Sequence, residues 1–148
     1  MKIRTDFVTN SSSSSFVIAY KPTPDYDEET LKKYPILKAY DKIIEILMES
    51  EDNCDTERAE VFTNLDDYNY SFLSRWQYEI SNLTVTNGIL SFDGEKWLQE
   101  KYNRAVQYLK QGFYIADKCV GYHDSMGDII RKIADNNEDF VLIDEDEI

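Results

Sequence analysis

The chain has 148 residues, of which 42% are hydrophobic and 14% aromatic, so it is long enough to bury one sizeable core and too apolar for intrinsic disorder. Its 29 Asp and Glu residues against 16 Lys and Arg give a formal net charge of −13, which opposes direct binding to nucleic acid and to anionic membranes. We therefore expect one domain spanning residues 1–148. Its charge permits binding to a basic protein partner, or serves solubility alone, and leaves the oligomeric state open.

Export and metal signals are weak. The first apolar stretch, Phe16–Tyr20, is too short for the core of a signal peptide or for a membrane span of about 20 residues. The two cysteines, Cys54 and Cys119, form no C-x-x-C pair and lie far from the ligand spacing of a zinc site. These features predict a cytoplasmic protein with two free thiols, no metal and no cofactor.

The N-terminal segment, residues 1–20, alternates at Ile3, Thr5 and Phe7, then carries a run of serines, 11–15, before the β-rich Phe16–Tyr20. This order predicts a hairpin or strand pair. Three interpretations of the serines stay open: a plain loop, which we favour, a modified stretch, or an anion-binding loop that lacks the phosphate-loop pattern.

A one-faced helix is predicted from Pro35, since apolar residues recur at helical spacing from Ile36 to Met48. The residues that follow, 49–60, are acidic and predict a solvated surface connection. Beyond them, Ala59–Thr63 is consistent with a short strand and Tyr68–Trp76 with a helix. The dipeptide Asn87-Gly88 then joins two alternating runs, which predicts a hairpin. In this register four apolar residues share one buried face: Leu83, Val85, Leu90 and Phe92.

The C-terminal part predicts a helix from Trp97 to Leu109 and then a β-α-β unit. Its parts are a strand at 113–120, a helix at 125–135 with a capping box from Ser125 to Asp128, and a strand at 140–143. Residues 144–148 are expected to form a solvated acidic tail. The predicted fold class is α+β: a single compact domain with a mixed or antiparallel sheet and three or four helices.

The opening residues Lys2-Ile3-Arg4-Thr5-Asp6-Phe7-Val8-Thr9-Asn10-Ser11, continuing to Phe16, resemble the start of many otherwise dissimilar, uncharacterised bacterial proteins. The resemblance covers about 16 residues of the 148. It implies a bacterial accessory gene, of which phage and other mobile elements are one source, and it implies no activity.

Two classes of function are compatible with this sequence. The favoured one is a non-enzymatic binding protein whose acidic, tyrosine-rich surface engages a basic protein partner. Its candidate partner-binding residues are Glu49, Glu51, Asp52, Asp55, Glu57, Tyr68 and Tyr70. The alternative is a small enzyme or ligand-binding domain, with His123, Asp124 and Ser125 at a strand-to-helix loop.

Overall fold

The computed structural model describes residues 13–22, 27–52, 55–121 and 124–147. In chain order the elements are β1 (Ser13–Tyr20), α1 (Glu28–Lys33), α2 (Pro35–Glu49), β2 (Glu60–Phe62), α3 (Leu65–Trp76), β3 (Ile80–Thr86), β4 (Ile89–Gly94), α4 (Lys96–Lys110), β5 (Tyr114–Gly121), α5 (Met126–Asn136) and β6 (Phe140–Glu147). The α+β class is confirmed, with five helices in the described residues instead of three or four. The additional one is the six-residue α1, which Asp27 caps by accepting a hydrogen bond from the Thr30 N–H at 2.7 Å.

Four strands form the main sheet in the order β2-β5-β1-β6, and each neighbouring pair is antiparallel. Because β5 and β6 both run antiparallel to β1, they are parallel to each other with β1 between them. Helix α5 joins them, so the C-terminal β-α-β unit is present with one strand inserted. The central position of β1 follows from its sequence, since Phe16–Tyr20 is apolar on both faces.

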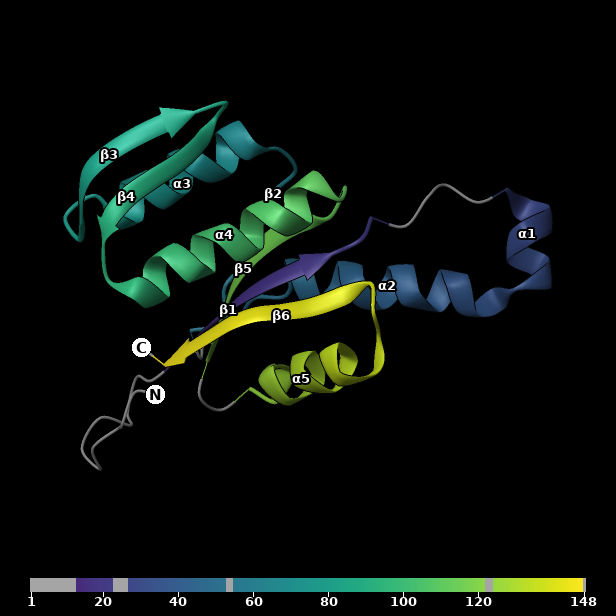
Figure 1. Ribbon diagram of the computed structural model, residues 1–148. Helices are drawn as coiled ribbons and strands as arrows, with labels where there is room; N and C mark the ends of the chain where they lie inside the picture. The colour runs from purple at the N-terminus through teal and green to yellow at the C-terminus, as the bar shows by residue number, and fades with distance from the viewer. Residues whose placement is uncertain (1–12, 23–26, 53–54, 122–123, 148) are drawn as a thin grey trace.

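The molecule is layered (Figure 1). Helices α2 and α5 cover one face of the four-stranded sheet, while α3 and α4 cover the other face and carry the β3-β4 hairpin on their outer side. Two hydrophobic clusters correspond to these faces: Phe16, Ile18 and Tyr20 point into one, and Val17 and Ala19 into the other. The strand alternation of β1 thus fixes which helices pack where.

The β3-β4 hairpin turns at Asn87 and Gly88, whose φ angles of 54° and 80° suit a tight two-residue turn. The burial expected for β3 is wrong. Leu90 and Phe92 on β4 are buried, but Leu83 and Val85 on β3 are 41% and 59% exposed, because the aromatic side chains of α3 and α4, Phe72 and Tyr102, pack against Phe92 of β4. A two-residue turn predicts Val85 opposite Leu90 and Leu83 opposite Phe92; the first pair is present, and a bulge between Ser81 and Thr84 interrupts the register at the second.

Three further expectations are corrected. Ser13–Ser15 belong to strand β1, so a plain loop is wrong for this part of the serine run; residues 1–12 lie outside the described residues. The acidic end is not a free tail, because β6 extends to Glu147 and pairs with β1. Asp144 forms an ion pair with Lys101 at 3.3 Å, and Glu145 forms a two-pronged pair with Arg131 at 2.9 and 2.7 Å. Strand pairing with β1 therefore holds this end on the sheet, and the two ion pairs connect its side chains to α4 and α5.

The capping box at the start of α5 is also wrong. The Met126 N–H donates to Asp124 Oδ1 at 2.9 Å, and the N-cap Ser125 makes no side-chain capping bond to the described helix. In the described residues, no helix is both long enough and apolar enough to cross a membrane.

Candidate functional site

The acidic segment, residues 49–57, begins at the last residue of α2 and leads toward β2. It contains no Lys or Arg. The predicted partner-binding side chains within it are all exposed: Glu49, Glu51, Asp52, Asp55 and Glu57. The structure therefore brings five of the seven predicted residues together on one connection between α2 and the sheet.

A buried lysine of the main sheet anchors this segment through hydrogen bonds. Lys118 on β5 is fully buried, and its Nζ donates to the Ser50 carbonyl at 2.6 Å, to Ser50 Oγ at 2.9 Å and to the Glu57 carbonyl at 2.6 Å. One ammonium thus joins both ends of the segment to the sheet. The Ser50 bonds also satisfy a carbonyl at the C-terminal end of α2, where cations are favoured.

Burial lowers the pKa of Lys118, since removal from water disfavours the charged form. Nearby negative groups oppose this effect, Asp124 most strongly, with Asp52 and Glu51 also contributing. The lysine and the carboxylates above it stabilise each other electrostatically. The anchor is therefore matched in charge to the segment that it holds.

A second anchor is Thr56, which is buried, with 2% of its surface exposed. Its Oγ1 donates to Asp124 Oδ2 at 2.8 Å and accepts from the Gly121 N–H at 2.8 Å. Burial alone raises the pKa of Asp124, but hydrogen bonds from Thr56 and from the Met126 N–H outweigh it, so the pKa of Asp124 is lowered. The carboxylate stays ionised and ties the acidic segment to the start of α5.

Backbone contacts complete the attachment. The Asp52 N–H donates to the Thr56 carbonyl at 3.0 Å, and the Glu57 N–H donates to the Cys119 carbonyl at 2.9 Å. Asp55 has a φ of 68°, a left-handed conformation that Asp and Asn adopt more readily than most residues. The described part of the segment is therefore a solvated surface connection, as expected from its composition, and hydrogen bonds hold its backbone.

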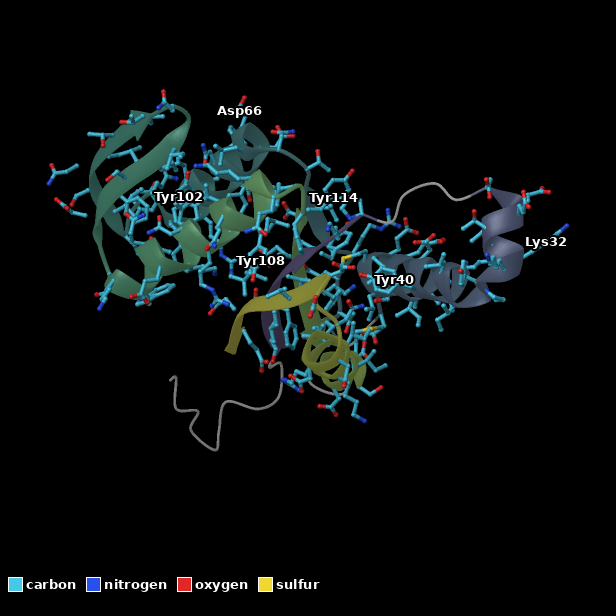
Figure 2. All side chains as sticks on the ribbon, turned by 45° about the vertical axis from the view of Figure 1, so that its right-hand side comes forward. Lys32, Tyr40, Asp66, Tyr102, Tyr108 and Tyr114 are labelled. Carbon is cyan, nitrogen blue, oxygen red and sulfur yellow. The ribbon has the colours of Figure 1, made fainter. Side chains whose placement is uncertain are left out.

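The two predicted tyrosines do not join this site. Tyr68 is buried in the core, where its ring stacks on Tyr102 with centroids 6.0 Å apart, so its assignment as a partner-binding residue is wrong. Burial and the nearby Asp117 raise the pKa of Tyr68. Tyr102 projects from α4 between the hairpin and α3, donating to Asn69 and accepting from the Leu90 N–H (Figure 2). Tyr70 is 78% exposed, but it lies on α3 beside β2.

The alternative site is described only in part. Tyr122 and His123 lie outside the described residues, so a catalytic role for His123 stays a prediction. Asp124 and Ser125 follow β5 as expected. Both carboxylate oxygens of Asp124 are engaged, by Thr56 and by Met126, which gives this residue a structural part in the anchor.

Neither the metal-binding residue types among the described residues nor known proteins identify a chemistry for this site. In the described ranges, no group of three or more His, Cys, Asp and Glu residues is arranged to hold a metal ion. Known protein families, curated proteins and solved structures provide no match to this chain. The site must therefore be interpreted from its own geometry.

Sequence reasoning missed the anchors, Lys118 and Thr56. A signal for Lys118 was present, because strand alternation places it on the same face as the apolar Ala116 and Val120. A lysine at an inward position of a strand predicts a buried partner. Thr56 gave no comparable signal, since nothing in the sequence links it to Asp124.

Proposed function

We propose that the protein is a non-enzymatic binding protein whose acidic segment, residues 49–57, engages a basic segment of a protein partner. The observation that carries this proposal is the anchoring by Lys118, which fixes the backbone at Ser50 and Glu57 while the five carboxylates remain exposed. Acidity alone would serve solubility equally well. A built attachment beneath the acidic residues favours a binding role.

Pre-organisation explains why such an attachment supports binding. A flexible acidic loop loses backbone entropy when a partner orders it, whereas a segment already held on the sheet loses less. Like charges held close together also repel one another, and a cationic partner relieves that repulsion. Complementary charge further accelerates association at low salt. We infer a cytoplasmic setting for this encounter, in keeping with the low cysteine content.

Selection from a displayed library of random peptides tests the proposal directly. Peptides retained by the wild-type protein are expected to be enriched in Lys and Arg. The segment variant neutralises all five carboxylates: Glu49→Gln, Glu51→Gln, Asp52→Asn, Asp55→Asn and Glu57→Gln. It should fold, because exposed substitutions usually change stability by less than about 0.5 kcal/mol each and Asn suits the left-handed position 55.

Enrichment of basic peptides on the wild type, and its loss on the segment variant, is the expected result. Equal enrichment on both proteins would contradict the proposal, because the charge of the segment would then be irrelevant to recognition.

A further inference from the structure

Strand β2 forms one edge of the main sheet. It pairs with β5 on one side, and the strand order places no other described strand on its second side. Its central residue, Val61, is 39% exposed. An edge strand with this exposure offers backbone hydrogen-bonding groups to another chain.

A hollow of about 390 Å³ lies on the α2 side of this edge. Its carboxylates come from α2 at i, i+4 and i+8, namely Asp41, Glu45 and Glu49, which places them in a row along one helix face. Apolar surface from Tyr20, Ile44 and Met48 lines the same hollow, together with the cations Lys21 and Arg58. Such a surface accommodates the aliphatic stem of a Lys or Arg whose charged end reaches a carboxylate.

A second hollow, of about 610 Å³, lies on the α3 side of β2. Its charged residues are the acidic Glu60, Asp67 and Asp117 and the basic Arg75, which is bound to Asp117 at 3.0 Å. The exposed Tyr70 lines it as well. Val61 borders both hollows, so the edge of β2 runs between them, with α2 and α3 on opposite sides of the sheet (Figure 1).

This arrangement matches the geometry of an added strand. Successive side chains of a strand point to opposite faces, so a peptide paired with β2 would place alternate side chains in the two hollows. The α2 hollow has three carboxylates and two cations, and the α3 hollow has three carboxylates and one cation, so acidic groups outnumber basic groups in both. In the α3 hollow Arg75 already pairs with Asp117, so the α2 hollow, with its row of three carboxylates beside apolar surface, is the side that favours Lys or Arg.

We propose that the open edge of β2 accepts a basic, extended segment of a partner protein as an additional strand. Main-chain hydrogen bonds to β2 would supply affinity, and alternate Lys or Arg side chains in the α2 hollow would supply specificity. This inference rests on the proposed function, because Glu49 belongs to both the acidic segment and the α2 hollow. It adds the binding mode and the sequence pattern of the partner.

The test uses two synthetic peptides of about six residues, the length of a short strand. In the alternating peptide every second residue is Lys and the others are Val or Thr; the block peptide has the same composition with its lysines adjacent. Both carry the same charge, but only the first presents all its lysines on one face. Affinity is measured by calorimetry, and hydrogen exchange of the amides of residues 60–62 reports on strand pairing.

We expect the alternating peptide to bind about tenfold more tightly than the block peptide and to protect amides of β2. Val61→Pro, which prevents strand addition at the edge, should remove this preference, whereas the control Val61→Thr keeps the backbone N–H and should retain it. Glu45→Lys covers the case in which the proline variant fails to fold. It reverses one exposed charge of the α2 hollow and should weaken the alternating peptide, while Glu28→Lys on α1 should not.

The outcomes separate the two proposals. Equal binding of both peptides without protection of β2, but with loss of binding in the segment variant, overturns strand addition and leaves the proposed function standing. Failure of both peptides to bind at low salt overturns both proposals. A dimer in sedimentation that Val61→Pro abolishes assigns the edge to a second copy of this chain and also overturns strand addition.

Discussion

Lys118 is the residue on which the candidate site depends most. A buried ammonium is expensive to remove from water, and here three hydrogen bonds and nearby carboxylates offset part of that cost. The two carbonyls that it satisfies belong to different elements, the end of α2 and the connection to β2. Loss of this one group would therefore disturb both ends of the acidic segment.

Replacement of the anchor gives the first prediction at this scale. Lys118→Met keeps the aliphatic length but leaves the Ser50 and Glu57 carbonyls without their donor, which should lower the free energy of unfolding by about 3 kcal/mol. Urea denaturation measures this loss, and hydrogen exchange should accelerate in the segment. The exposed Lys38→Met on α2 is the control, with an expected change within about 0.5 kcal/mol. Similar losses in both variants would refute the role of Lys118.

Tyr40 gives a second prediction, of opposite sign. Its Oη is buried and has no hydrogen-bond partner among the described residues. Tyr40→Phe removes an unsatisfied hydroxyl and should raise the free energy of unfolding by about 1 kcal/mol, whereas Tyr70→Phe, whose ring is exposed, should leave it unchanged. Destabilisation by Tyr40→Phe would show that this hydroxyl is satisfied in solution.

The same substitution has a signed dependence on pH. Burial, with Asp139 and Asp41 nearby, raises the pKa of Tyr40 to about 12 from an ordinary value of 10.0. Between these values the unfolded chain loses the phenolic proton while the folded protein keeps it, so the wild type loses stability as the pH rises. The Phe variant lacks this contribution and should lose less stability over this range. Parallel alkaline unfolding curves for the two proteins would contradict this explanation.

At the scale of elements, local sequence patterns predicted the helices and strands that depend on residues close together in the chain. The helix from Pro35, the two strands around Asn87-Gly88 and the C-terminal β-α-β order follow from periodicity and turn residues. The burial of individual side chains was predicted less well, because burial depends on packing partners that are distant in the sequence. Leu83 and Val85 alternate as buried residues do, yet both are exposed, whereas Phe92 on β4 packs against Phe72 of α3 and Tyr102 of α4.

The candidate site shows the same division. Composition was sufficient to locate the acidic segment, but the contact of Thr56 with Asp124 spans 68 residues and has no local signature. The acidic end at 144–147 also has the composition of a tail. Its place on the sheet comes from pairing with β1 and from ion pairs with Lys101 and Arg131 of two helices, and sequence spacing does not predict these contacts.

The base of the hairpin provides a prediction at this scale. A Cβ added at Gly94 would lie 2.8 Å from the Glu79 carbonyl oxygen, which is backbone and cannot move aside cheaply. Gly94→Ala should therefore lower the free energy of unfolding by about 2 kcal/mol. Ser91→Ala, exposed on the same strand, is the matched control and should change little. Thermal unfolding compares the two, and equal melting temperatures would show that the hairpin shifts without cost.

At the scale of the whole molecule, the residues that form the hydrophobic core and the residues proposed to bind a partner lie in different places. The two hydrophobic clusters lie on either side of the main sheet, and α2 closes one of them through Ile44, Leu47 and Met48. The acidic segment begins where that packing ends. The same helix thus contributes to the core and carries the first carboxylate of the segment.

Net charge and charge position must be distinguished, because a formal charge of −13 attracts basic molecules wherever the carboxylates lie. A dispersed variant makes this distinction: Glu28→Gln, Glu29→Gln, Asp66→Asn, Asp135→Asn and Glu138→Gln. It removes an equal number of negative charges, five, from exposed positions outside the segment, including Asp66 on α3 (Figure 2). The segment and dispersed variants therefore carry equal net charge.

The most direct test is a titration of one basic peptide, selected on the wild type, against the wild type, the segment variant and the dispersed variant. The titrations are run at about 50 mM and about 200 mM salt, across which screening of exposed charges increases. The account predicts that the wild type and the dispersed variant bind tightly at low salt and lose affinity at high salt, while the segment variant binds several-fold more weakly at low salt. Equal weakening of the two variants, or an affinity that salt does not change, would contradict recognition by the anchored acidic segment.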